Sequence, residues 1–297
     1  MSLALPSLPA PRLAALNAAY AEARRASRQR ILLGAVLVLG LALASGWMAD
    51  VDLGMLWSRG GQFFDYFGRL LRLESGPRAG AWVWTDPAEW FWGLAHWLTL
   101  LGDTVLMAYV GTLVGAAAGF ALALMAAANL VASGPLRWLA KRMLEVCRTV
   151  PDIVFALVFV IAFGLGPLPG VLALAIHSAG ALGKQAVEII ENIDRHPVEG
   201  CLAAGANWLS TIRFGVLPQV LPGLLAYGLL RFEVNVRSAA VLGFVGAGGI
   251  GQELIEAIRK FYYNDVAALL VLIMLTVSLI DIVTSQLRHR LQDAELR

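Results

Sequence analysis

The chain has 297 residues, of which 59% are apolar and 15% are charged, whereas soluble globular domains are about 45–50% apolar and about 25% charged. Its formal net charge is only +2, so the composition gives no basic surface for nucleic acid. The apolar residues gather into runs of about twenty, the length with which a helix crosses about 30 Å of hydrocarbon. We therefore expect an all-α integral membrane protein.

The first 30 residues form an arginine- and alanine-rich arm with apolar side chains at helical spacing on one side. We expect a helix that lies on the inner membrane surface. The first apolar run, at 31–49, predicts a transmembrane helix. Because its apolar core ends in the small-residue pattern Ala42-Leu43-Ala44, a cleaved secretory signal is the alternative. The arginines of the arm (1–30) are Arg12, Arg24, Arg25, Arg28 and Arg30.

Residues 50–98 mix charges with prolines and tryptophans, and we expect an external loop that returns along the membrane interface, where indole rings settle. Five further apolar runs follow, which makes about six transmembrane helices in all. The tryptophans are Trp82, Trp84, Trp90, Trp92 and Trp97. The five runs lie at about 101–128, 150–166, 168–187, 219–241 and 266–285.

Basic residues indicate the orientation of these helices, because short positive loops stay in the cytoplasm. They cluster between the second and third runs and after the last run, whereas the turn between the third and fourth runs is uncharged. We therefore expect both termini inside, a core at 99–297, and a cytoplasmic connection at about 188–217. The basic residues are Arg137, Lys141, Arg142 and Arg148 in the first group and Arg288, Arg290 and Arg297 in the second.

Glycines mark two places in the predicted helices. Gly111, Gly115 and Gly119 recur every fourth residue, a small-residue face that lets two backbones approach closely. We expect close packing within the bundle rather than a dimer contact. The segment Gly246–Gly251 formally matches the dinucleotide motif G-x-G-x-x-G, but that motif needs a preceding strand. Here it follows an apolar helical run, so we expect an unwound or kinked stretch that lines a cavity or is buried in protein.

The chain carries no other signal for chemistry of its own. Gly183-Lys184 is followed by Gln185, which excludes a P-loop, so any ATP must bind another chain. No His, Asp and Glu residues have metal-ligand spacing, and no serine or cysteine has an obvious base partner. Cys147 and Cys201 form no disulfide framework, and we expect two free thiols.

The predicted cytoplasmic connection has an unusual pattern in EGCLAAGANWLSTIRFGVLPQVLP. It reads as a short amphipathic helix, a glycine turn, a second short helix and a proline stop. Gly205 allows a close turn between the two helices, and Pro218 fixes the angle at which the chain re-enters the membrane. This design suits a lever seated in a pocket of a partner protein.

The same segment resembles the coupling segment of ABC-importer permeases, whose pattern is Glu-Ala-Ala, three residues, Gly, nine residues and Ile-x-Leu-Pro. Glu199, Gly205, Leu217 and Pro218 stand at the matching spacings. The resemblance implies that these four residues couple the chain to an ATPase.

Three positions depart from the pattern, since Gly200 and Cys201 replace the two alanines and Gly215 stands where isoleucine is usual. From about Gly102 to the C-terminus the chain is similar to the phosphonate branch of these permeases, on segments such as RTVPDIVFALVFVIAFGLGPLPG and YGLLRFEVNVRSAAVLGFVGAGGIG. The resemblance implies a type I ABC importer permease fold in the inner (plasma) membrane. It implies a homodimer of permeases, two ATPase subunits that bind ATP and Mg, and an external substrate-binding protein, with no reaction catalysed by the permease itself.

Four polar residues alternate in the predicted fifth transmembrane helix: Arg231, Glu233, Asn235 and Arg237. At 100° per residue Glu233 and Arg237 are 40° apart, which predicts an i to i+4 ion pair, while Arg231 and Asn235 share another side. A helix that is polar on two sides belongs inside the bundle, near the axis shared by two permease copies. Either Glu233 merely neutralises Arg237, or the net positive charge attracts an anion along a translocation pathway.

His177 and Asp281 also lie in predicted helices, and we expect both to be satisfied structural groups, whereas His196 is expected in the cytoplasmic loop. Two other functions remain open. An ion-coupled secondary transporter or channel would work without an ATPase and use the charges inside the membrane. It would have no use for the coupling segment, and the sequence lacks a two-fold repeat. A membrane-anchored dinucleotide enzyme rests only on the glycine-rich segment.

Overall fold

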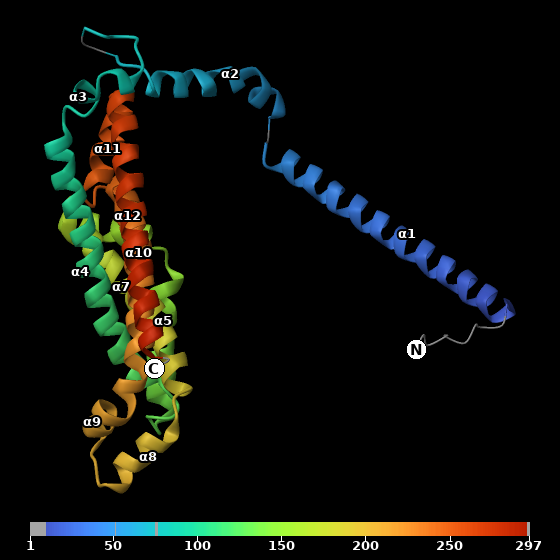
Figure 1. Cartoon of the computed structure of the whole chain (residues 1–297), viewed down its shortest axis with the longest axis vertical. Helices are drawn as coiled ribbons and strands as arrows, with labels where there is room; N and C mark the ends of the chain where they lie inside the picture. The colour runs from blue at the N-terminus through green and yellow to red at the C-terminus, as the bar shows by residue number, and fades with distance from the viewer. Residues whose placement is uncertain (1–9, 51, 75–76, 296–297) are drawn as a thin grey trace, which may run out of the picture. The chain divides into compact units, whose positions relative to one another are not determined.

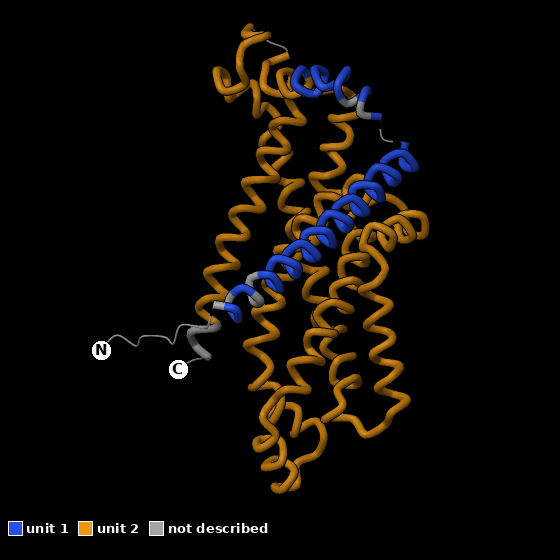
Figure 2. The backbone as a smooth tube through the Cα atoms, turned by 90° about the vertical axis from the view of Figure 1, so that its right-hand side faces the viewer, with its two compact units in different colours: residues 1–65 blue, residues 66–297 orange. Residues whose placement is uncertain are grey.

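The computed structural model describes residues 10–50, 52–74 and 77–295, and helices make up nearly all of this described chain. It divides into two compact units, residues 1–65 and 66–297, which Figure 2 draws in different colours. The longer helices are α1 (Ala10–Met48), α2 (Leu53–Leu70), α4 (Leu94–Ala126), α5 (Gly134–Thr149), α6 (Asp152–Phe163), α7 (Pro167–Glu191), α10 (Leu217–Leu242), α11 (Ile250–Arg259) and α12 (Tyr263–Glu295).

In the first unit, α1 joins the predicted arm and the first predicted transmembrane run in one continuous helix. Its large apolar side chains from Ile31 to Leu43 are between 61% and 71% exposed. The stretch Ala18–Met48 is long and apolar enough to cross a membrane. An apolar helix with every side exposed is suited to lipid on all sides.

In the second unit, α4, α7, α10 and α12 run side by side, as Figure 1 shows. The α8 (Arg195–Ala203) and α9 (Trp208–Thr211) helices lie at one end of this bundle, and α3 (Pro87–Trp90) lies at the opposite end. The predicted cytoplasmic connection and the part of the predicted external loop that belongs to this unit therefore lie at opposite ends of the bundle.

The close contact between α4 and α7 depends on the repeated glycines. A Cβ atom on Gly115 would lie 2.6 Å from the carbonyl oxygen of Ala175, and one on Gly119 would lie 2.6 Å from that of Ala179. No side chain fits at these distances, so the two backbones approach as closely as glycine allows. The expected packing within the bundle is confirmed.

The prediction of an all-helical membrane protein with several spans is confirmed, and the described helices differ in how clearly each one qualifies as a span. By length and composition four helical stretches could cross a membrane, or five if α5 and α6, which are bent by 87°, count as one. The α6 helix alone has 12 residues, about 18 Å. The α7 helix is long enough but carries polar residues, and its neighbours α4, α5, α6 and α10 reduce its contact with lipid. The four stretches are Ala18–Met48, Leu94–Ala126, Trp208–Val245 and Tyr263–Leu291.

The glycine-rich segment forms a tight buried turn between α10 and α11. Gly246, Gly248 and Gly249 have φ of +89°, +80° and +72°, a region that favours glycine. The following amide, that of Ile250, donates to the hydroxyl of Thr104 at 2.9 Å, and Ala247 is fully buried. The prediction of an unwound stretch buried in protein is confirmed, and a helix precedes it where a dinucleotide site requires a strand.

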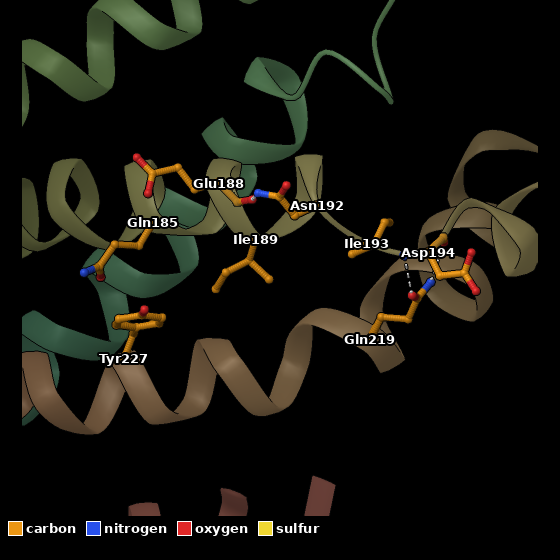
Figure 3. A pocket seen from close by; sticks show the side chains of 8 residues that line it. All are labelled: Gln185, Glu188, Ile189, Asn192, Ile193, Asp194, Gln219 and Tyr227. Atoms are coloured by element: carbon orange, nitrogen blue, oxygen red, sulfur yellow. Dashed lines mark hydrogen bonds between the residues drawn. The ribbon is translucent and has the colours of Figure 1, made fainter. Parts of the chain in front are cut away.

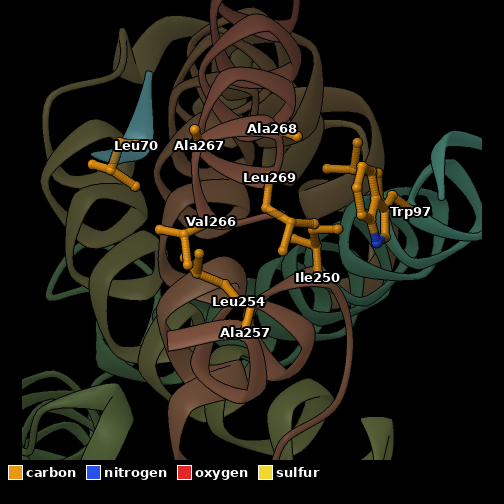
Figure 4. Close-up of a cluster of buried hydrophobic side chains, with 10 residues drawn as sticks. Leu70, Trp97, Ile250, Leu254, Ala257, Val266, Ala267, Ala268 and Leu269 are labelled. Atoms are coloured by element: carbon orange, nitrogen blue, oxygen red, sulfur yellow. The ribbon is translucent and has the colours of Figure 1, made fainter. Parts of the chain in front are cut away.

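The predicted external loop contains more regular structure than expected: α2, a 3₁₀ turn at Val83–Thr85, α3 and the start of α4. Trp97 belongs to α4 and is buried in a cluster with Leu101, Ile250, Leu254 and Leu269, part of which Figure 4 shows. Trp97 is therefore part of the packed interior of the protein rather than of an exposed loop. Trp82, Trp84 and Trp92 are exposed.

Candidate functional site

The segment that resembles a coupling loop folds as two short helices, α8 (Arg195–Ala203) and α9 (Trp208–Thr211), joined by a turn at Gly205. Gly205 has a φ of +79°, a left-handed backbone conformation that is strained for residues with a side chain. The close turn expected at this residue is confirmed.

The expected proline stop is wrong. The backbone passes from α9 through a π-helical turn at Ile212–Val216 directly into α10, and the amide of Leu217 donates to the carbonyl of Ile212, five residues earlier. Pro218 lies in the first turn of α10. Proline lacks an amide hydrogen and clashes with the carbonyl four residues before it; the π turn shifts the bonding register at this point, so the helix continues.

Polar side chains cap both short helices. The carboxylate of Asp194 accepts from the amide of His196 at 3.0 Å and contacts its Nδ1 at 2.6 Å. The hydrogen bond from the His196 amide, and then that from its ring, hold the pKa of Asp194 below its usual value; the carboxylate in turn raises the pKa of His196. Asn207 caps α9 by accepting from the amide of Ser210 at 2.8 Å. Such caps satisfy amides that a helix start leaves free.

One side chain that the sequence did not single out ties α8 to α10. The amide oxygen of Gln219 accepts from the backbone amide of Asp194 at 3.1 Å, and its Nε2 donates to the backbone carbonyls of Asp194 at 3.2 Å and Gly215 at 2.5 Å. Gly215 is buried, and a Cβ there would lie 3.2 Å from the Cα of Val198 in α8. The glycine that replaces isoleucine therefore serves packing within the chain.

The outer surface of this segment carries large apolar side chains among charged and polar ones. Four large side chains in or beside α8 and α9 are between 49% and 71% exposed, and Glu199 is exposed among them. A compact exposed apolar group with a few polar neighbours is typical of a protein contact. Of the four predicted coupling residues, Glu199 and Gly205 lie on this exposed segment, while Leu217 and Pro218 begin α10. The four apolar residues are Leu202, Trp208, Leu209 and Phe214.

A cavity of about 500 Å³ lies between the end of α7 and the start of α10. Figure 3 shows that its lining is mostly polar, with Gln185 and Glu188 on α7 opposite Tyr227 and Gln219 on α10. The cavity adjoins the clamp between Gln219 and Asp194. A polar space therefore begins beside the coupling segment and extends along the two helices.

Deeper in the bundle, two of the four predicted pathway residues meet at one serine. Arg231 donates from Nε to the hydroxyl of Ser178 at 3.2 Å, and Asn235 donates to the same hydroxyl at 2.7 Å. Asn235 is fully buried and also donates to Thr112 at 2.8 Å. The expectation that Arg231 and Asn235 share one side of the helix is confirmed. The sequence did not identify Ser178 and Thr112 because they lie on α7 and α4.

The other two predicted residues form the expected ion pair. Arg237 donates to Glu233 one turn earlier, and Arg288 of α12 lies 4.0 Å from the second carboxylate oxygen. The side chain of Glu233 is 12% exposed and that of Arg237 is 54% exposed. Glu233 is therefore flanked by two cations, and the helix α10 lies against α4, α7 and α12, inside the bundle as predicted.

His177 does not fit the expectation of a satisfied structural group, because its Nδ1 is buried without a hydrogen-bond partner. Asp281 is exposed on α12, and no other described residue forms a hydrogen bond or ion pair with its side chain. Both residues require something that the described chain does not supply.

Comparisons with known proteins agree with the helical bundle. A family model described as a binding-protein-dependent transport system inner membrane component matches residues 119–294. The phosphite transport system permease protein PtxC of Stutzerimonas stutzeri is 40% identical over 198 residues, which cover 67% of this chain and 72% of that protein. The putative cryptic phosphonate transport system permease protein PhnE2 of Escherichia coli is 56% identical over 117 residues, 39% of this chain and 96% of the relative.

Among solved structures, a chain of the MetNI methionine ABC transporter in inward-facing conformations superposes with a TM-score of 0.58 at 23% sequence identity. The match covers 69% of this chain and 98% of that chain. At this identity the likeness shows the fold, which is that of a type I ABC importer permease. Because the family model covers more than half of the residues, this chain belongs to the inner membrane components of binding-protein-dependent transport systems.

Proposed function

We propose that this chain is the membrane permease of an ATP-driven importer for phosphite, phosphonate or a related phosphorus oxyanion. Family membership gives a transport subunit of a binding-protein-dependent system. The substrate class is supported by relatives that are named for phosphite and phosphonate transport. These anions share a tetrahedral phosphorus with several oxygens, so one arrangement of hydrogen-bond donors serves them all.

The coupling segment is the proposed contact with the ATPase. The exposed apolar side chains of α8 and α9 suit a cleft on a partner, and the Gln219 bonds allow a movement of α8 to reach α10. In this proposal two permease copies carry two ATPase subunits, which bind ATP and Mg, and an external protein delivers the anion. Family membership places the chain in the inner membrane, and the arginine distribution favours an orientation with both termini inside.

Within the bundle, we choose the pathway residues by whether each arginine is paired with a carboxylate. Arg237 and Arg288 both face Glu233, so the carboxylate offsets one of these two positive charges and the ion pairs hold α10 in place. Arg231 forms no ion pair in the described chain and donates only through Nε. We therefore assign Glu233 and Arg237 to structure and assign Arg231, positioned through Asn235, to the pathway.

Uptake by cells tests this proposal. A strain without its own phosphorus-oxyanion importers receives this permease with the ATPase and binding protein of the same transport system. Labelled phosphite or methylphosphonate should accumulate, and labelled methionine, the substrate of a structurally similar importer, should not. Accumulation of methionine without either phosphorus compound would overturn the assignment of the substrate class.

A further inference from the structure

Arg231 of α10 and His177 of α7 present polar nitrogens that the rest of the described chain leaves unused. Arg231 is bonded through Nε alone, so its two terminal nitrogens keep four N–H donors. His177 forms no hydrogen bond with any described residue, and its Nδ1 is buried. Buried polar groups in proteins almost always have a partner, so the buried Nδ1 of His177 indicates a missing ligand or water, and the unused N–H donors of Arg231 could bind the same ligand.

The arginine is held in a fixed position. Its Nε bonds the fully buried Ser178; Asn235 bonds both Ser178 and Thr112, and Thr112 donates to the backbone of α4 at 2.6 Å. A further buried atom, the Oδ1 of Asn235, has no partner in the described chain and would accept from a water or an acidic O–H. Three helices thus hold one guanidinium in place, which lowers the ordering cost of binding.

A negatively charged residue lies near Arg231 and His177. Asp152 is the first residue of α6, a helix that packs against α7 and contacts α10, and its charge acts on both Arg231 and His177. Asp152 and Arg231 form no ion pair in the described chain. The Asp152 carboxylate instead accepts a hydrogen bond from the backbone amide of Ile153 at 2.9 Å. The carboxylate therefore weakens the positive potential without occupying the N–H donors of Arg231.

The position suits a molecule in transit. Arg231 lies 14 residues after the start of α10 at Leu217, about 21 Å along the helix. Tyr227, one turn before Arg231, lines the polar cavity beside the coupling segment. An anion released from Arg231 would therefore meet the polar lining of that cavity.

We propose that Arg231, His177 and Ser178 form a weak binding site for one phosphorus oxyanion inside each permease, and that Asp152 keeps its affinity low. The inference rests on the proposed function. The two terminal nitrogens of the guanidinium bind two oxygens side by side, and the imidazole donates to a third. A site on a transport path must release its ligand, so a nearby carboxylate that weakens binding favours turnover.

Binding is measured on the assembled permease–ATPase complex without the binding protein, because that protein would dominate the affinity. Uptake is measured separately, in proteoliposomes with the binding protein outside. Line broadening in ³¹P NMR spectra reports weak binding of phosphite, and uptake into proteoliposomes reports transport. Arg231→Gln and His177→Gln should each weaken phosphite binding about tenfold or more and reduce uptake, with normal assembly and ATPase activity. His96→Gln, which changes an exposed histidine on α4, is the matched control and should change neither.

Asp152→Asn provides a second test, because its expected result, tighter phosphite binding, would not arise from misfolding. It should tighten phosphite binding yet slow maximal uptake, the opposite change in affinity from the other two variants. Arg231→Lys, which keeps the charge but loses the paired donors, should bind with intermediate affinity. Unchanged binding in assembled Arg231→Gln and His177→Gln complexes, or wild-type transport without any phosphite binding, would overturn this site while the proposed function stands. A wild-type complex that transports no phosphorus oxyanion would instead overturn the proposed function itself.

Discussion

The side-chain amide of Gln219, in the first turn of α10, holds both the N–H and the C=O of Asp194, the residue that caps α8. Few side chains other than an amide can accept and donate at once in this way. The coupling segment is thus attached to a helix of the bundle by a rigid polar clamp as well as by the chain itself.

Gln219→Glu should weaken coupling, because the carboxylate keeps the acceptor but loses both donor bonds and faces two carbonyl oxygens. Each lost bond costs about 0.5–1.5 kcal/mol, so we expect transport per ATP hydrolysed to fall several-fold at normal abundance. The control is Gln185→Glu, in the same cavity but with no hydrogen bond to another described residue. An equal effect of the two changes would remove the clamp from the account.

The turn at Gly205 can be tested with a change that respects its conformation. Asparagine tolerates a positive φ, whereas a β-branched residue does not. Because nothing lies within 4 Å of a Cβ at Gly205, Gly205→Asn should assemble and transport, while Gly205→Val should strain the turn by about 1–2 kcal/mol and reduce coupling. Proteolysis of the α8–α9 segment and uptake assays measure both effects. Equal behaviour of Asn and Val would mean that the left-handed turn is not required.

Replacing two glycines of α4 with alanine distinguishes the effect of helix packing on stability from the effect of helix propensity. Gly115→Ala should destabilise the bundle by about 1–3 kcal/mol, because its Cβ would meet the backbone of Ala175 in α7. Gly102→Ala has open space around the new Cβ and should stabilise the helix by up to about 1 kcal/mol. Thermal unfolding in detergent compares the two proteins with wild type. A stabilised Gly115→Ala protein would contradict the close α4–α7 contact.

The cap of α8 gives a pH dependence with two limits. Asp194 raises the pKa of His196 in the folded protein. The stability that the protonated His196 ring adds to α8 is therefore fully present below the unfolded-state pKa of His196, and it is lost as pH rises through the raised folded-state pKa. Because the His196 amide and ring lower the pKa of Asp194, its contribution is present above the unfolded-state pKa and is lost as pH falls through the lowered folded-state pKa. Protection of α8 amides from hydrogen exchange should therefore be greatest between these two titrations.

An NMR titration of His196 checks the cause. Asp194→Asn keeps a good helix cap but removes the charge, so the pKa of His196 should fall toward the ordinary imidazole value while other histidines are unchanged; Glu199 still raises it. The same His196 pKa in both proteins would show that the carboxylate does not stabilise the ring.

Cys201 and Cys147 report the orientation of the membrane protein. Both are free and partly exposed, and Cys201 lies in α8. If the basic connections are inside, an impermeant maleimide should label neither thiol in intact cells and should label Cys201 once the membrane is opened. Cys201→Ser identifies the labelled site. Labelling of Cys201 from outside would reverse the proposed orientation.

Structural features that depend only on residues close together in the sequence could be predicted. Hydropathy located the apolar helices, and the Glu233–Arg237 pair followed from helical spacing because both residues lie on one helix. The glycine repeat predicted a close helix contact but not its partner, α7. Local spacing also could not show that Pro218 would be accommodated by a π turn, because that depends on how α9 and α10 bond as one helix.

The contacts that define the candidate site join residues far apart in the sequence. Asn235 meets Thr112 across 123 positions and Ser178 across 57, and which helices pack together is decided by the whole bundle. A small polar residue in an apolar run, as Ser178 is beside His177, was the available signal, but it does not reveal its partner. Arg288 was expected in a cytoplasmic tail, and its approach to Glu233 follows only from the length and course of α12.

The most direct test of the account is uptake by proteoliposomes that contain the permease with its ATPase, with the binding protein and labelled phosphite outside. We predict accumulation that requires ATP within the vesicles, stops with a non-hydrolysable analogue and is unaffected when ion gradients are collapsed. Accumulation driven by an ion gradient in vesicles that contain the permease alone would contradict the account and identify an ion-coupled secondary transporter instead.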